Sequence, residues 1–197
     1  PKNKQTLLFS ATMPKEIKDL SENYLNNPAE VAVAPIAKPA ENIKQQVIFL
    51  KASEKLNALQ NLLRTRRTKR VLVFSRTKHG ADKVVKSFKS IGLSLDAIHG
   101  NKSQGQRQRA LDNFKNGKCF ALIATDIAAR GIDVREVEIV VNYDLPDVPE
   151  TYIHRIGRTA RAGASGLAIS FCSLDERKNL SALLGAFVLP KRFFSIN

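Results

Sequence analysis

Residues 71–91 read VLVFSRTKHGADKVVKSFKSI, and they open with four apolar residues, Val71 to Phe74. An uninterrupted apolar run of this length is typical of a strand that is buried on both faces of a parallel sheet. The stretch 78–91 differs, because its apolar side chains recur at the spacing of one helix face: Ala81, Val84, Val85 and Phe88. Gly92 is placed to end that helix. The sequence therefore predicts a buried strand followed by an amphipathic helix.

The same alternation of short apolar runs and helix-like segments continues in both directions from residues 71–91. We expect further strands at 6–9, 30–33, 46–50, 94–98, 119–124, 138–142 and 167–172. We expect further helices at 14–26, 53–64 and 103–115, and a last one from about residue 175. Ser53 is a candidate N-cap, and Ser103 with Gln106 is a candidate capping box. This alternation predicts an α/β fold with a mostly parallel sheet and helices on both faces.

The composition is ordinary for a soluble globular domain. The chain has 197 residues, 43% hydrophobic and 25% charged, which is enough for one domain and part of another. No apolar run approaches the length of a membrane span, and the start at Pro1 suggests a piece of a longer protein. Cys119 and Cys172 lie in apolar strand-like runs, which favours buried free thiols and a reducing, cytoplasmic setting. Three histidines without paired spacing predict no metal site.

The charge of the chain is strongly positive. Lysine and arginine number 32 against 18 acidic residues, which gives a net charge of +14. Such an excess favours a polyanionic partner, with nucleic acid first and an anionic membrane second. No amphipathic basic helix stands out, so a membrane partner is not expected.

The segment 152–161 is the most basic functional candidate. It carries Arg155, Arg158 and Arg161 at three-residue spacing beside His154. On a helix this spacing would place the three guanidinium groups on one broad face. Like charges this close repel one another unless an anion lies between them, and arginine is well shaped to bind phosphate. The segment therefore predicts a phosphate site, with a solvated basic face as the alternative.

Ligands of parallel α/β sheets bind beyond the carboxyl ends of the strands. The polar groups expected at that edge are those of residues 75–80, 99–107 and 125–133, together with the arginine segment.

Six short motifs occur in a fixed order along the chain. They are SAT at 10–12, VFSRT at 73–77, QGQR at 104–107, ATDIAARGID at 124–133, VNYDLP at 141–146 and HRIGRTAR at 154–161. With them the chain resembles the C-terminal half of a DEAD-box ATP-dependent RNA helicase, and residues 41–43 resemble the bacterial RhlE-like subgroup. The resemblance implies a RecA-like fold. It divides the chain into the tail of a first RecA-like domain (1–34), a linker (35–45), the second RecA-like domain (46–187) and an unassigned tail (188–197).

The resemblance also implies roles in ATP hydrolysis. Arg158 and Arg161 would be arginine fingers that reach the γ-phosphate of ATP held by another domain. Gly131 and Asp133 would bind ATP, with Asp133 on the ribose hydroxyl, and Arg130 would orient their loop by ion pairing. A helix or turn cap is the alternative role of Asp133. Arg155 is expected to be structural. His154 would link the ATP site to the other motifs, with a satisfied core histidine as the alternative.

A second implied set of residues contacts RNA. Its members would offer hydroxyl, backbone N–H, amide and guanidinium groups to phosphates and 2′-hydroxyls: Thr77, Gly80, Gln104, Arg107 and Thr125. Such contacts hold a strand without reading its bases. Gln104 and Arg107 have plain solvated helix residues as their alternative interpretation. Ser10 and Thr12 would couple ATP hydrolysis to RNA separation.

Two nucleotide motifs are missing from the sequence. Gly100 and Gly105 have the spacing of a phosphate-binding loop, but Gln106 and Arg107 follow instead of Lys and Ser or Thr. No Asp-Glu-Ala-Asp run occurs. The expected cofactor is therefore ATP with Mg²⁺, whose metal and phosphate-loop ligands lie in an N-terminal RecA-like domain, and the isolated chain is expected to hydrolyse no ATP.

The expected partners are RNA and that N-terminal domain, in the cytoplasm, with a ribosome or RNA-decay assembly as a further option that no residue identifies. A non-enzymatic RNA-binding module and a DNA-directed helicase remain alternative functions. Ala160 stands where the family commonly has glycine, and its methyl group is expected to be tolerated on a helix.

Overall fold

The computed structural model describes residues 4–10, 13, 15–31, 42–66, 69–129, 137–185 and 194–195. The chain divides into two compact units, Pro1–Ala37 and Lys38–Asn197, which we call the N-terminal and C-terminal units.

The N-terminal unit contains one helix among its described residues, α1 (Lys15–Tyr24), which confirms the helix predicted at 14–26. The strand predicted at 6–9 is wrong, because these residues form no β-pairing in the structure. A strand needs a neighbour to satisfy its backbone groups, and the described residues of this unit provide none. Leu7 and Phe9 are instead 66% and 87% exposed. Glu30 and Val31 also lie outside any strand, and the other residues predicted with them are not described.

The described part of the C-terminal unit is built on a seven-stranded sheet in the order β3-β4-β2-β5-β6-β1-β7, in which every strand pair is parallel. The strands are β1 (Ile43–Phe49), β2 (Val71–Phe74), β3 (Asp96–Ile98), β4 (Ala121–Ala124), β5 (Ile139–Asn142), β6 (Gly166–Cys172) and β7 (Phe194–Ser195). The helices are α2 (Lys55–Thr65), α3 (Lys78–Lys89), α4 (Gln104–Lys115), α5 (Asp126–Ala129), α6 (Pro149–Ile156) and α7 (Arg177–Gly185). Short 3₁₀ helices are η1 (Ala52–Glu54), η2 (Arg161–Gly163) and η3 (Leu174–Glu176).

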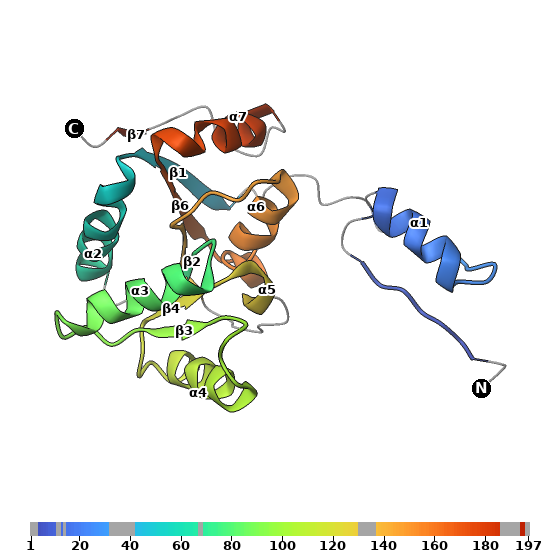
Figure 1. Ribbon diagram of the computed structural model, residues 1–197, viewed down its shortest axis with the longest axis horizontal. Helices are drawn as coiled ribbons and strands as arrows, with labels where there is room; N and C mark the ends of the chain where they lie inside the picture. The colour runs from blue at the N-terminus through green and yellow to red at the C-terminus, as the bar shows by residue number, and fades with distance from the viewer. Residues whose placement is uncertain are drawn as a thin grey trace. The chain divides into compact units, whose positions relative to one another are not determined.

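Helices cover both faces of the sheet, as Figure 1 shows. On one face α2 and α3 pack against alternate strand residues such as Val73 of β2. On the other face α4 and α5 pack against residues such as Leu72, and α6 and α7 pack against residues such as Ala168. Leu72, Val140 and Ala168 are in register across β2, β5 and β6, so these four helices share one face. The predicted α/β architecture is confirmed.

Several predicted boundaries differ from the structure. Strand β1 begins at Ile43, three residues before the predicted strand and inside the range predicted as a linker. The prediction of Ser53 as an N-cap is wrong, because Ser53 lies inside η1 and the Glu54 carboxylate accepts from the Lys51 N–H at 2.7 Å. The capping box of Ser103 and Gln106 before α4 is confirmed.

Both cysteines are buried free thiols, as predicted. Burial raises the pKa of Cys119 to about 12 and that of Cys172 to about 11. Both groups therefore stay protonated and unreactive near neutral pH. None of the helices in the described ranges has the length and apolar character that crossing a bilayer requires.

Candidate functional site

The carboxyl ends of β3, β4 and β2 form one continuous edge. These strands are neighbours in the sheet, and backbone hydrogen bonds run on past their ends. The Thr125 N–H donates to the carbonyl of Ile98 at 3.2 Å, and the Ser75 N–H donates to that of Ala124 at 3.0 Å. The predicted RNA-contacting residues follow these three strands: Thr77 and Gly80 follow β2, Gln104 and Arg107 follow β3, and Thr125 follows β4.

Thr77 and Gly80, which follow β2, are joined by a hydrogen bond at the start of α3. Thr77 is the N-cap of α3, and its Oγ1 accepts from the Gly80 N–H at 3.0 Å. A hydroxyl that accepts one hydrogen bond keeps its own proton to donate, so Thr77 remains a donor for a phosphate oxygen. A Cβ at Gly80 would lie 2.7 Å from the Ser75 hydroxyl, so the close approach requires glycine. The Gly80 N–H, predicted as an RNA donor, is engaged in this cap.

Gln104 and Arg107 lie on one face of the first turn of α4. Their side chains are one turn apart, with Arg107 Nη1 3.5 Å from Gln104 Oε1. Gln104 is exposed and Arg107 is half-buried. The N-terminus of a helix favours anions, so both groups stand where a phosphate would be stabilised.

The arginine segment is not one continuous helix, which corrects the prediction of three guanidinium groups on one helix face. Helix α6 ends at Ile156, Arg158 follows it in a turn, and Arg161 is the first residue of η2. The break comes at Gly157, whose N–H donates to the carbonyl of Ile153 at 2.9 Å and closes the last turn. Glycine is a poor helix former, which is consistent with an end here.

Arg155 is the member of the segment that lies inside α6, and it is buried. Its Nε and Nη2 bind the Asp126 carboxylate at 2.6 and 2.7 Å in a bidentate pair. Its Nη1 donates to Asn142 Oδ1 at 3.1 Å and to the carbonyl of Asp144 at 2.6 Å, and the guanidinium lies 5.1 Å from the Phe74 ring centre. One side chain thus joins the ends of β4, β5 and β2, as expected of a structural residue.

Arg158 and Arg161 lie close enough to influence each other. Partial burial, and then the positive charge of Arg161, lower the pKa of the Arg158 guanidinium. Arg161 Nε donates to the carbonyl of Gly157 at 3.2 Å, which holds its side chain back towards α6. Two neighbouring cations of this kind attract a multivalent anion. His154 is exposed on α6, so its alternative interpretation as a core histidine is wrong.

The last part of the arginine segment, around Arg158 and Arg161, lies at the start of β5, whereas the Arg155 side chain reaches the carboxyl ends of β4 and β5. Buried Thr159 forms a parallel β-bridge with Val137, two residues before β5 begins. Its hydroxyl donates to the carbonyl of Val137 at 2.6 Å and lies 3.1 Å from that of Glu138. The expectation that this segment shares the carboxyl edge with the RNA-contacting groups therefore holds for the Arg155 side chain but is wrong for the backbone at Arg158 and Arg161, because the connection from α6 to β6 passes the opposite end of β5.

Ala160 has left-handed backbone geometry, with φ of 56° and ψ of 33°. The prediction that its methyl group sits on a helix is therefore wrong. In this conformation the Cβ of an L-residue crowds the following carbonyl oxygen, whereas glycine has no such contact. Ala160 stores local strain at the point where the chain turns between the two arginines.

Replacing Ala160 by glycine is expected to raise the free energy of unfolding by about 1 kcal/mol. Relief of the left-handed strain exceeds the extra entropy that glycine gives the unfolded chain. Chemical denaturation of the two proteins measures the difference. Ala164→Gly is the matched control, because Ala164 has an ordinary φ of −69° and the change should be neutral or destabilising there. Equal effects of the two changes would contradict the strain at Ala160.

Several predicted site residues lie outside the described residues: Thr12, Arg130, Gly131 and Asp133. Ser10 is described and exposed in the N-terminal unit. Their assigned roles stay predictions.

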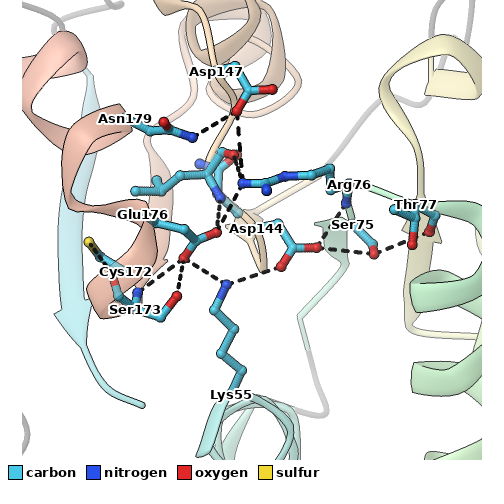
Figure 2. A network of polar contacts seen from close by, with 12 residues as sticks. Lys55, Ser75, Arg76, Thr77, Asp144, Asp147, Cys172, Ser173, Glu176 and Asn179 are labelled. Carbon is cyan, nitrogen blue, oxygen red and sulfur yellow. Dashed lines mark hydrogen bonds and ion pairs between the residues drawn. The ribbon is translucent and has the colours of Figure 1, made fainter. Parts of the chain in front are cut away.

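A buried ionic network beside the carboxyl edge was missed by the sequence analysis (Figure 2). Lys55 Nζ lies 3.1 Å from Asp144 Oδ1 and 2.7 Å from Glu176 Oε2. Asp144 belongs to the fifth of the six motifs, but Lys55 and Glu176 belong to none of them. These two residues are 121 positions apart, at the start of α2 and at the end of η3, so no local pattern could pair them.

Comparisons with known proteins identify the family of the chain. The family described as the helicase conserved C-terminal domain matches residues 54–163. The pre-mRNA-splicing ATP-dependent RNA helicase PRP28 of Pyricularia oryzae is 42% identical over 175 residues, which cover 88% of this chain and 26% of that protein. The ATP-dependent RNA helicase DBP2 of Saccharomyces cerevisiae is 44% identical over 186 residues, which cover 92% and 34%.

The solved structures that resemble this chain include DEAD-box proteins. Saccharomyces cerevisiae Dbp5 bound to RNA and ADP BeF3 has a TM-score of 0.86 and 33% identity, covering 100% of this chain and 52% of that one. The C-terminal domain of the DEAD-box protein Dbp5 has a TM-score of 0.71 and 35% identity, covering 79% and 91%.

The chain belongs to the helicase conserved C-terminal domain family. Within that family it carries the C-terminal, RecA-like domain of a DEAD-box helicase, as the sequence predicted. The chain spans about a quarter to a third of the length of the two curated relatives described above. The narrower assignment to a bacterial RhlE-like subgroup stays a prediction.

Proposed function

We propose that the chain is the C-terminal half of an ATP-dependent RNA helicase, an ATP hydrolase whose other RecA-like domain binds the nucleotide. The observation that carries this proposal is the placement of the predicted RNA-contacting groups. They come from three separate segments, yet they follow three neighbouring strands, β3, β4 and β2, on one edge of the sheet. A DEAD-box relative with the same fold is described as bound to RNA and ADP BeF3, which supports the proposal.

The arginine segment has the chemistry that an ATP γ-phosphate needs. Arg158 and Arg161 are neighbouring cations, and the pKa of Arg158 is already lowered by burial and by Arg161. A phosphate between them would relieve their repulsion, so the charges of Arg158 and Arg161 suit the γ-phosphate of a bound nucleotide. Bound ATP would supply the transferred phosphoryl group, and the two guanidinium groups would stabilise the charge that develops on it.

The same proposal assigns the Mg²⁺ ligands and the phosphate-binding loop to the N-terminal RecA-like domain. No group of three or more metal-ligating side chains gathers among the described residues. With the ligands divided in this way between the two domains, the ATP site would be complete only when the domains come together. A cytoplasmic location and an association with ribosomes or an RNA-decay assembly remain part of the proposal.

RNA would be held through its backbone. The groups on the carboxyl edge are a hydroxyl at Thr77, an amide at Gln104 and a guanidinium at Arg107, which suit phosphates and 2′-hydroxyls. Their side chains come from loops and helix starts, and none of them presents an aromatic ring for base stacking. Binding is therefore expected to be independent of base sequence.

A strand-separation assay with the full-length protein tests the proposed function. Short RNA duplexes are expected to separate with ATP and to stay paired with ADP, and matched DNA duplexes are expected to separate far more slowly. RNA binding without ATP turnover would favour the non-enzymatic RNA-binding module. Equal separation of DNA would favour the DNA-directed helicase. The isolated chain serves as a negative control, because we expect it to hydrolyse no ATP.

Replacing Arg107 by glutamine is expected to weaken RNA binding and to flatten its salt dependence. A plot of log binding constant against log salt concentration has a negative slope. The magnitude of that slope should decrease by about 0.7, which is the contribution of one phosphate contact to a single strand. Fluorescence anisotropy with a single-stranded RNA across a salt series measures both effects.

Arg109→Gln is the matched control for this change, because it removes the same charge from the same helix. Arg109 lies two positions further along α4, on a different face, and its Nε is 3.4 Å from the carbonyl of Gly105. Equal changes of slope for the two variants would argue against a specific phosphate contact at Arg107.

A further inference from the structure

The backbone of the loop between β2 and α3 is bound by the carboxylate of Asp144. Asp144 Oδ2 accepts from the backbone N–H of Arg76 at 2.9 Å and from the Ser75 hydroxyl at 3.3 Å. The Ser75 hydroxyl also lies 3.4 Å from the carbonyl of Thr77. The Asp144 carboxylate is therefore one of the contacts that fix residues 75–77, the segment that carries Thr77.

Lys55 holds that carboxylate from the opposite side. Its ammonium lies 3.1 Å from Asp144 Oδ1 and 2.7 Å from Glu176 Oε2. Lys55 and Glu176 are both buried, at 5% and 3% exposure. A buried ammonium between two carboxylates has no solvent alternative, so it keeps both partners at a fixed separation.

Glu176 is fixed in turn by the ends of two more strands. Its Oε2 accepts from the backbone N–H of Ser173 at 3.1 Å and from the Ser173 hydroxyl at 2.9 Å, beyond β6. Its Oε1 accepts from the Leu145 N–H at 3.0 Å, beyond β5. Figure 2 shows the resulting series of contacts, from Glu176 through Lys55 and Asp144 to the loop.

A second contact leads from Glu176 to the same loop. Arg76 Nη2 lies 3.6 Å from Glu176 Oε1 and 3.3 Å from the carbonyl of Leu145. The side chain and the backbone N–H of Arg76 are thus held by two different carboxylates of one network.

We propose that Lys55 and Glu176 are positioning residues for RNA binding, which hold residues 75–77 in place through Asp144. The inference rests on the proposed function, because it assumes that Thr77 contacts RNA. It assigns a role to two residues outside all six motifs. Neither residue touches the RNA itself, since both are buried beneath the loop.

Binding of a fluorescein-labelled ten-residue oligouridylate to the purified chain tests this role by anisotropy, at a temperature where circular dichroism shows each variant to be folded. Lys55→Met keeps the apolar stem and removes the ammonium. It is expected to weaken RNA binding about five- to tenfold, the range in which coupled contacts usually fall. Leu59→Ala is the matched control, because buried Leu59 lies one turn further along α2 and contacts the core instead of the network. It should keep RNA affinity within about twofold.

Thr77→Ala separates positioning from general destabilisation. In the otherwise unchanged chain it should reduce affinity, because a contact is lost. In the Lys55→Met background it should have little further effect, because the loop already holds Thr77 out of place. In the Leu59→Ala background its full effect should persist.

Four outcomes would count against the inference. Unchanged affinity of Lys55→Met would overturn it and leave the proposed function standing, as would equal losses for Lys55→Met and Leu59→Ala. A chain that binds no RNA before any substitution would overturn the proposed function and the inference together. If Lys55→Met does not fold, Glu176→Gln tests the inference in its place. This change keeps the volume of the Glu176 side chain and removes the negative charge that binds Lys55. Unchanged affinity of that variant would equally overturn the inference.

Discussion

Replacing Arg161 by alanine in the full-length protein is expected to slow RNA-stimulated ATP hydrolysis by about 10³-fold or more. The same result is expected for Arg158→Ala. The reason is electrostatic, since these two cations would face the charge that develops on the transferred phosphoryl group. Steady-state ATPase rates at saturating RNA measure the loss in kcat.

The matched control is Arg177→Ala, which removes an exposed arginine of α7 that lies outside the arginine segment. Its turnover should stay near that of the unchanged protein. Arg161→Lys is informative as well, because it keeps the charge and loses the planar fork, so activity should return only in part. Undiminished turnover of both Arg158→Ala and Arg161→Ala would remove these residues from the proposed ATP site.

Replacing Arg155 by alanine is expected to lower the free energy of unfolding of the C-terminal unit by about 3 kcal/mol. The change leaves the Asp126 carboxylate without its bidentate partner and strips buried Asn142 of a donor. Because Asp126 is 31% exposed, water can solvate the carboxylate that is left without its partner. The expected loss of stability is therefore at the lower end of the range for a broken buried ion pair. Chemical denaturation of the purified chain measures this change.

The control for Arg155 is the exposed ion pair of Lys69 and Glu138, whose side chains are 47% and 40% exposed. Lys69→Ala should cost less than about 1 kcal/mol, because water screens the pair and solvates the charge that remains. The contrast tests burial directly, since both changes remove one cation from one ion pair. A loss at Arg155 as small as that at Lys69 would contradict the structural role of Arg155.

The strands of the sheet were predictable because they are buried on both faces. Val71–Phe74, Ala121–Ala124 and Ile139–Asn142 are short apolar runs, and the structure places them side by side. The amphipathic helices on either face were predictable for the same reason, since burial on one side leaves a periodic pattern. Local chemistry also sufficed for the capping box at Ser103.

The errors have a common cause in contacts that are distant along the chain. The apolar residues Leu7 and Phe9 look like a strand, but no neighbouring strand meets them among the described residues. The left-handed Ala160 lies next to Thr159, which pairs with Val137 before the start of β5. The Lys55 network could not be predicted, because its members are close in space but far apart in the sequence.

The position of β1 has a consequence for how the domain forms during synthesis. This strand comes first in the C-terminal unit, yet it pairs with β6, and Ile43 is in register with Gly166. A ribosome must therefore release more than a hundred further residues before β1 acquires that partner. Long-range parallel pairing of this kind is slow, and an early strand that waits for a late one leaves apolar surface open to misassembly. We expect nascent chains that end before β6 to depend on chaperones more than the finished domain does.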